Sequence, residues 1–255
     1  MTPPSLRPLS VGEILDVSFA LYRRHFGPLA AIAVACSAAP FLVGLYLAAS
    51  GGALLNPPLL LLYLLLLVML GTVATAATVF IVSESYLGRS LSAGEAVRRA
   101  VPLLGRLFAA SLLCFMLVAL GFVFLFVPGV VVGCGLLLFI PALVLEPGAT
   151  ARGALARSWR LTRGARWRMF ALLLTLAILL YIPVAGVQGV LALLMGAPLT
   201  RVATGAGLLI PVAGGVVQML AYPFFYCVLV VAYYDLRVRK EGFDLEVLAS
   251  TLRLA

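Results

Sequence analysis

The chain has 255 residues, of which 64% are hydrophobic and only 11% are charged, and its mean hydropathy is +1.18. A soluble globular domain has about 45–50% apolar and about 25% charged residues, so the composition excludes that class and indicates an integral membrane protein. The formal net charge of +9 does not indicate nucleic-acid binding, because the runs of basic residues adjoin apolar segments, where a membrane surface explains them.

The first predicted element is an amphipathic helix over residues 10–25. Ser10 and Glu13 have the spacing of a capping box, and the charged residues gather on one side of the helix. Such a helix lies along a membrane surface. Two apolar segments follow, at 28–49 and 59–86, and each is long enough to cross a bilayer, with a kink or local unwinding expected near Pro40.

The same plan returns twice along the chain. Ser92 and Glu95 repeat the capping-box spacing and begin a basic helix at 92–104. Spans at 107–126 and 130–145 follow, with a turn expected at Val127-Pro128-Gly129. A third amphipathic helix at 150–164 precedes spans at 169–195 and 207–234, and a polar tail occupies 235–255.

These elements predict an all-α fold in one transmembrane domain over residues 1–255. It contains six transmembrane helices and three interfacial helices, in a weak threefold repeat of surface helix plus helical hairpin. All 18 Lys and Arg residues except Arg201 fall on one side of this arrangement. The positive-inside bias therefore predicts a multi-pass protein with both termini and all three interfacial helices in the cytoplasm, and no cleaved signal peptide is expected.

Residues 144–170 concentrate basic and aromatic side chains between two spans. Glu146 is expected to form an ion pair with one of the arginines that follow it, which would hold the third interfacial helix against the bundle. The stretch is also a candidate surface for anionic lipid or a protein partner, because basic residues near a membrane attract anionic headgroups. The candidate residues of this surface are Arg152, Arg157, Trp159, Arg160, Arg163, Arg166, Trp167 and Arg168.

A few other polar residues near or within the spans have candidate structural roles. Glu84 is expected to pair with Arg89 or with another loop arginine at the membrane surface. The two glutamines within the last spans either form interhelical hydrogen bonds, with each other or with backbone freed by prolines, or line a substrate path. The tyrosine pair before Asp235 is typical of an interfacial belt that ends the sixth span. The candidates are Glu84, Glu146, Gln188, Gln218 and Asp235.

No catalytic, cofactor-binding or metal site is predicted. The single histidine, His25, has no Cys, Asp or Glu at ligand spacing, and the common nucleophile, metalloprotease and phosphate-binding motifs do not occur. The four cysteines lie in apolar segments and are expected to be free thiols. Small residues are frequent enough in the spans to permit a homo-oligomer.

Two functions of different classes remain open on these grounds. The first is a non-enzymatic scaffold or regulatory module that engages anionic lipid, or a membrane or cytoplasmic protein partner, through its basic interfacial helices. The second is a transporter or lipid-handling protein, whose spans would be interrupted near Pro40, Pro183, Pro211 and Pro223 as in discontinuous transporter helices. The interiors of the six spans contain no Asp, Glu, Lys, Arg or His, one of which a coupled transporter usually places there.

Three blocks of sequence, at 6–27, 144–170 and 231–248, resemble the glycerophosphoryl diester phosphodiesterase membrane domain family of bacteria. The Arg-Ser-Trp-Arg-Leu-Thr-Arg-Gly run at 157–164 and the Tyr-Tyr-Asp-Leu-Arg run at 233–237 carry most of the resemblance. The resemblance implies a six-span protein of the bacterial cytoplasmic membrane. It does not imply the phosphodiesterase activity, because the catalytic barrel joined to some members needs about 250 residues of its own and several histidines.

Overall fold

The structure is a computed structural model and describes residues 7–49, 56–194 and 209–242. Within these ranges every regular element is a helix, which confirms the all-α fold. The helices are α1 (Val11–Arg24), α2 (Phe26–Ala49), α3 (Pro57–Tyr86), α4 (Ala93–Ala100), the 3₁₀ turn η2 (Val101–Leu103), α5 (Leu104–Phe124), α6 (Phe126–Leu136), α7 (Phe139–Leu145), α8 (Ala151–Thr162), α9 (Arg166–Leu194) and α11 (Leu209–Glu241).

The three amphipathic helices begin where their capping residues predict. Ser10 and Ser92 each cap a helix and exchange hydrogen bonds with the glutamate three residues on, so both capping boxes are confirmed. The Thr150 hydroxyl accepts a hydrogen bond of 3.1 Å from the Gly153 amide at the start of α8. Each of these helices buries a small apolar face against the long helices and keeps most of its charged side chains outside.

Six helical segments among the described residues are long and apolar enough to cross a membrane. Many of their large apolar side chains face outward: Val123 is 81% exposed and Leu193 83% exposed. A soluble protein does not expose apolar surface on this scale, whereas hydrocarbon chains cover it at no cost. The chain is therefore a multi-pass membrane protein.

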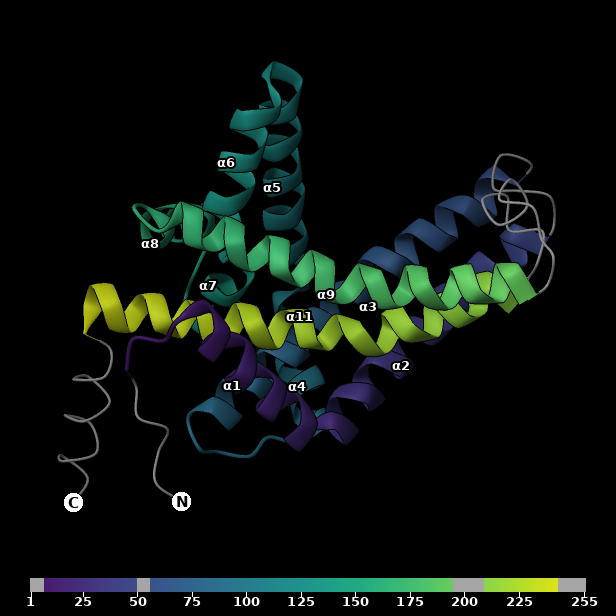
Figure 1. The fold of residues 1–255 in the computed structure, drawn as a ribbon, viewed down its shortest axis with the longest axis horizontal. Coiled ribbons are helices and arrows are strands. Elements are labelled where there is room, and N and C mark those ends of the chain that lie inside the picture. The colour runs from purple at the N-terminus through teal and green to yellow at the C-terminus, as the bar shows by residue number, and fades with distance from the viewer. Residues whose placement is uncertain (1–6, 50–55, 195–208, 243–255) are drawn as a thin grey trace.

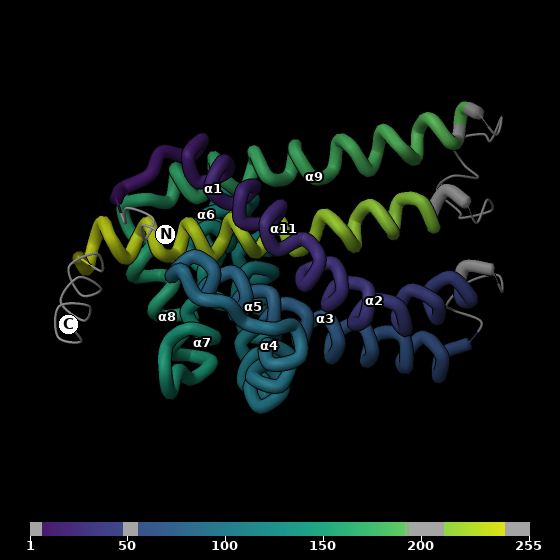
Figure 2. Tube along the Cα trace, turned by 90° about the horizontal axis from the view of Figure 1, so that it is seen from below, coloured from purple at the N-terminus to yellow at the C-terminus, as the bar shows by residue number. Residues whose placement is uncertain are grey.

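The central helix of the fold is α11, which contacts α1, α2, α3, α7, α8 and α9. Between Cys227 and Ala232 its side chains are buried on every side, as expected of a helix that is apolar all round. In Figures 1 and 2, α9 and α11 run lengthwise beside each other, and α2 and α3 extend toward the same end of the molecule.

The hairpin of α5 and α6 takes a different direction from the other long helices. It projects sideways from the bundle in Figure 1 and is seen nearly end-on in Figure 2. At its tip a Cβ atom on Gly121 would lie only 2.9 Å from the Gly129 Cα, so the two glycines permit the close approach of α5 and α6. The six apolar helices therefore qualify as spans by length and composition, but they do not share one axis.

Several expected boundaries are wrong. The chain reverses at Leu125, before the expected Pro-Gly turn, and Pro128 lies in the first turn of α6, where no intrahelical donor is required. The fourth span ends at Leu145 as predicted, but it begins at Phe126 and a short turn divides it into α6 and α7. The last helix continues to Glu241, so residues 235–241 are helix and not tail, while 243–255 lie outside the described residues.

The helices also continue through their internal prolines. Pro40, Pro183 and Pro223 lie inside α2, α9 and α11 without a break in the helix, and Pro211 lies in the first turn of α11. The expected unwinding near Pro40 is therefore wrong. Each internal proline removes one backbone hydrogen bond and leaves the carbonyl four residues earlier without its helical donor.

His25, at the junction of α1 and α2, provides a pH-dependent contact. Its Nε2 lies 2.6 Å from the Ser85 hydroxyl, and its pKa is lowered from 6.5 by burial and then by the charge of Arg24. The fold thus favours the neutral ring, so the folded protein binds fewer protons than the unfolded chain as pH falls below 6.5. We expect the free energy of unfolding to decrease on that side of pH 6.5. Comparison of urea unfolding at pH 7.5 and about pH 5.5 should show a smaller decrease in His25→Gln.

Candidate functional site

The six arginines of the predicted basic surface fall into three groups: two form ion pairs within the protein, one stacks on Trp159 and three are exposed. Arg157 donates to Glu146 at 2.6 Å and to both carboxylate oxygens of Glu241, one of them at 2.7 Å. The Tyr233 hydroxyl donates to the same Glu146 at 2.7 Å. Hydrogen bonds from Arg157 to Glu241, and then to Glu146, raise the pKa of Arg157 despite its partial burial. The expected ion pair of Glu146 is confirmed, and Arg157 is occupied by it.

Arg168 is the second paired arginine of this surface. It donates to Asp235 at 2.6 Å and also to the Leu9 carbonyl. Asp235 is only 1% exposed and additionally accepts from the Leu9 amide at 2.7 Å and from Arg239 at 3.1 Å. The carboxylate therefore joins the segment before α1, the start of α9 and the end of α11.

The buried position of Asp235 within α11 corrects two expectations for the end of the sixth span. Asp235 does not end the helix, and Tyr233 and Tyr234 are buried at 0% and 4% exposure, so they do not form an interfacial belt. Tyr234 stacks on Tyr86 with ring centroids 5.3 Å apart, and its hydroxyl lies 2.7 Å from that of Ser83. Sequence reasoning failed here because a tyrosine pair beside a charge occurs equally at a membrane surface and in a polar core.

A third arginine, Arg166, stacks on an aromatic ring. Its guanidinium carbon lies 4.0 Å from the centroid of the Trp159 ring, which is a cation–π contact. Trp159 also packs on Gly135 of α6, where a Cβ atom would overlap the ring. Arg166 Nε is the one buried side-chain polar atom without a hydrogen-bond partner in the described part of the chain. Trp159 and Arg166 thus connect α6, α8 and α9.

Three exposed arginines of the predicted surface, together with Trp167, form the basic face, whereas Trp159, which is 36% exposed, is engaged by Arg166. Arg152, Arg160 and Arg163 lie within about 100° of one another around α8, opposite its buried side chains. Trp167, at the start of α9, is 84% exposed. The Lys240 ammonium donates to the carbonyls of Arg160 and Arg163 and holds the end of α8 against α11. The end of α8 that carries Arg160 and Arg163 is therefore joined to α11.

Glu84 behaves as the sequence predicts. Its carboxylate lies 3.2 Å from Arg99 and 3.8 Å from Arg89, in an ion cluster at the end of α3 beside α4. All three side chains are at least partly exposed, so the cluster contributes little to stability.

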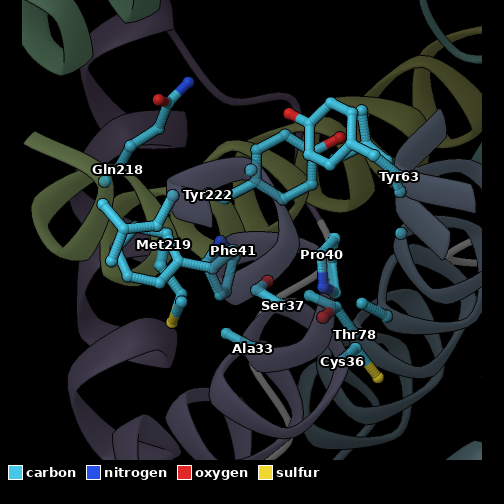
Figure 3. A pocket seen from close by; sticks show the side chains of 17 residues that line it. Ala33, Cys36, Ser37, Pro40, Phe41, Tyr63, Thr78, Gln218, Met219 and Tyr222 are labelled. Atoms are coloured by element: carbon cyan, nitrogen blue, oxygen red, sulfur yellow. The ribbon is translucent and has the colours of Figure 1, made fainter. Parts of the chain in front are cut away.

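A cavity of about 610 Å³ lies between α2, α3 and α11, shown in Figure 3. Its volume is within the range of ligand-binding pockets, about 300–1,000 Å³. Two smaller cavities adjoin it, one of about 420 Å³ against α9 and one of about 200 Å³ against α5 and α7. Tyr222 lines all three cavities, and Gln218 lines the two larger ones.

The two predicted glutamines are therefore placed differently from each other. Gln188 lies against the backbone of α11 at Gly214, where a Cβ atom would overlap its amide. Gln218 is exposed to the cavities. Among the described residues no hydrogen bond joins the two side chains, so direct pairing is wrong and only Gln218 is in a position to line a path. The sequence signal for this cavity is a polar residue shortly before an internal proline, Ser37 before Pro40 in α2 and Gln218 before Pro223 in α11.

The described residues form no metal site, and comparison with known proteins finds no match. In the described ranges no group of three His, Cys, Asp or Glu side chains lies close enough to hold a metal ion. Comparison of the chain with protein-family models, with curated proteins and with solved structures finds no match.

Proposed function

We propose that the protein is a non-enzymatic module of the bacterial cytoplasmic membrane that binds anionic lipid headgroups through the basic face of Arg152, Arg160, Arg163 and Trp167. The observation that carries the proposal is the exposure of these side chains along α8 and at the start of α9, while the other face of α8 is buried. In the proposed orientation this end of the bundle is cytoplasmic, in keeping with the positive-inside bias. The resemblance to the membrane domain family, which we retain as a proposal, fits this role.

The charges of the basic face support a lipid ligand of moderate affinity. Each exposed arginine near an anionic leaflet contributes about 1 kcal/mol of attraction, and an exposed Trp is favourable at headgroup level. Three arginines together contribute about 3 kcal/mol, or somewhat more than a hundredfold in affinity. Arg157 and Arg168 contribute little to this term because internal carboxylates already neutralise them.

The test is replacement of Arg152, Arg160 and Arg163 by glutamine, followed by native mass spectrometry after mild detergent extraction. We expect the apparent affinity of the protein for phosphatidylglycerol to fall about a hundredfold, because the removed charges face the headgroups. A matched control replaces Arg89, Arg98 and Arg99, which removes the same charge from the region of α4. Equal losses in both triple variants would mean a general charge effect and would contradict the proposal.

A second candidate function is lipid handling within the membrane, with or without a protein partner. The cavity between α2, α3 and α11 favours it, because a fully packed bundle would leave no space for a ligand. The continuous helices weigh against the discontinuous-helix form of a coupled transporter.

A further inference from the structure

We infer that the cavity between α2, α3 and α11 is a binding site for an uncharged, single-chain amphiphile, a long hydrocarbon chain that carries a hydroxyl group or an ester carbonyl. The inference goes beyond the proposed headgroup binding, because none of the side chains of the basic face lines this cavity.

The apolar part of the ligand follows from the walls of the cavity. Most of the lining consists of aliphatic and aromatic side chains from the three helices, as Figure 3 shows. Close helix contacts bound the space: a Cβ atom on Gly215 would lie 2.5 Å from the Phe41 ring, and one on Gly44 would lie 3.0 Å from the Tyr63 ring. An apolar cavity of this size accepts a hydrocarbon chain.

The polar part follows from side chains to which the described residues supply no hydrogen-bond partner. Ser37, Tyr63, Thr78 and Gln218 line the cavity, and none of them has a side-chain hydrogen-bond partner among the described residues. Thr78 is only 3% exposed, yet its hydroxyl keeps some accessible surface, because Arg166 Nε is the one fully buried side-chain polar atom without a partner in the described ranges. In a membrane interior an unpaired polar group is costly, so an occupant that supplies donors or acceptors is preferred over plain hydrocarbon.

The prolines leave two backbone carbonyls of cavity-lining residues without a helical donor. Pro40 has no N–H group to offer the Cys36 carbonyl, and Pro223 has none for the Met219 carbonyl. All four residues line the cavity. A ligand hydroxyl is a suitable donor to such a carbonyl, whereas an ester carbonyl is a suitable acceptor for the Gln218 amide.

The absence of charge excludes ionic ligands from this site. Among the described residues that line the cavity there is no Asp, Glu, Lys, Arg or His. A phosphate or carboxylate at this depth would carry an unpaired charge in a low-dielectric environment, which is far more costly than an unpaired hydroxyl. A neutral amphiphile is therefore preferred over a phospholipid or a fatty acid anion.

The experiment uses the full chain in nanodiscs and a diazirine-labelled monoacylglycerol as photocrosslinking probe. We expect crosslinks on α2, α3 and α11 that unlabelled monoacylglycerol competes away and that an equal amount of phosphatidylglycerol does not. Gly71 lines the cavity with no atom within 4 Å of a Cβ position, so Gly71→Leu should fill the space and abolish the competed crosslinks. Gly186→Leu on α9, equally free of neighbours, is the matched control and should leave them unchanged.

A second variant keeps the inference testable if Gly71→Leu does not fold. Gln218→Leu keeps the approximate volume and removes the hydrogen-bonding amide, and we expect about a fivefold weaker competition constant, the value for one neutral hydrogen bond. Crosslinks that resist competition, or that are equal in the Gly71 and Gly186 variants, would mean ordinary bilayer contact and would overturn the inference. Replacement of the three arginines of the basic face should not change the crosslinks, so the two proposals fail separately.

Discussion

Replacement of Asp235 by alanine is expected to lower the free energy of unfolding by about 3–5 kcal/mol, the range for removing one partner of a buried ion pair. The Asp235 side chain is fully buried and is the common acceptor for Arg168, Arg239 and the Leu9 amide. Its loss leaves the positive charge of Arg168, which is only 21% exposed, without a carboxylate. It also releases the segment before α1 from the end of α11.

Reversible unfolding in mixed micelles, followed by circular dichroism, measures this effect. Asp16→Ala is the matched control, because Asp16 lies exposed on α1 and should change stability by less than about 0.5 kcal/mol. Asp235→Asn retains the shape and one acceptor, so an intermediate loss is expected. A loss below about 1 kcal/mol for Asp235→Ala would show that solvent or lipid screens this cluster and that it does not fasten the helices.

The second large effect is expected at Gly135, where α6 meets α8. The Gly135 carbonyl accepts hydrogen bonds from Ser158 at 2.9 Å and from Thr162 at 3.0 Å, and the Trp159 ring covers the position that a Cβ atom would occupy. Gly135→Ala should therefore displace Trp159 from Arg166 and destabilise the protein by about 1–3 kcal/mol. This destabilisation acts against the increase in helix stability, up to about 1 kcal/mol, that alanine normally gives over glycine within a helix.

Gly133→Ala provides the control two residues earlier in the same helix. No atom lies within 4 Å of a Cβ position there, so this variant should be neutral or slightly stabilised. A Trp167→Phe background leaves Trp159 as the only tryptophan, and its fluorescence emission should shift in the Gly135 variant alone. Identical melting temperatures and emission spectra for the two alanine variants would contradict the close contact.

Both predicted effects concern one end of the bundle, where distant parts of the chain meet. Glu146 and Arg157 connect α7 and α8 to the end of α11, and Asp235 and Arg168 connect α9 and the segment before α1 to the same helix. Three of the six arginines that the sequence marks as one cluster, Arg157, Arg166 and Arg168, are engaged in these contacts or in the stack on Trp159. The basic face is what remains.

The sequence by itself determined the features that depend on neighbouring residues. Capping boxes at Ser10 and Ser92, the buried and exposed faces of α8, and six apolar segments of spanning length all follow from periodicity and composition over a few turns. The pairing of Glu146 with an arginine was predictable because eleven residues separate it from Arg157. In each case the deciding interactions are local in the chain.

Only the tertiary structure decided which side chains meet across long separations. The Leu9 amide and Asp235 are 226 residues apart, and nothing in the pattern around Tyr233 distinguishes a polar core from a membrane surface. The direction of the α5–α6 hairpin, the continuity of the helices through their prolines and the cavity beside Gln218 likewise depend on how whole helices pack. An apolar helix is equally stable against lipid and against protein, so the spacing of its apolar residues does not show which helix it packs on. The packing is decided instead by close contacts, such as that of Gly121 with Gly129, and by buried polar pairs.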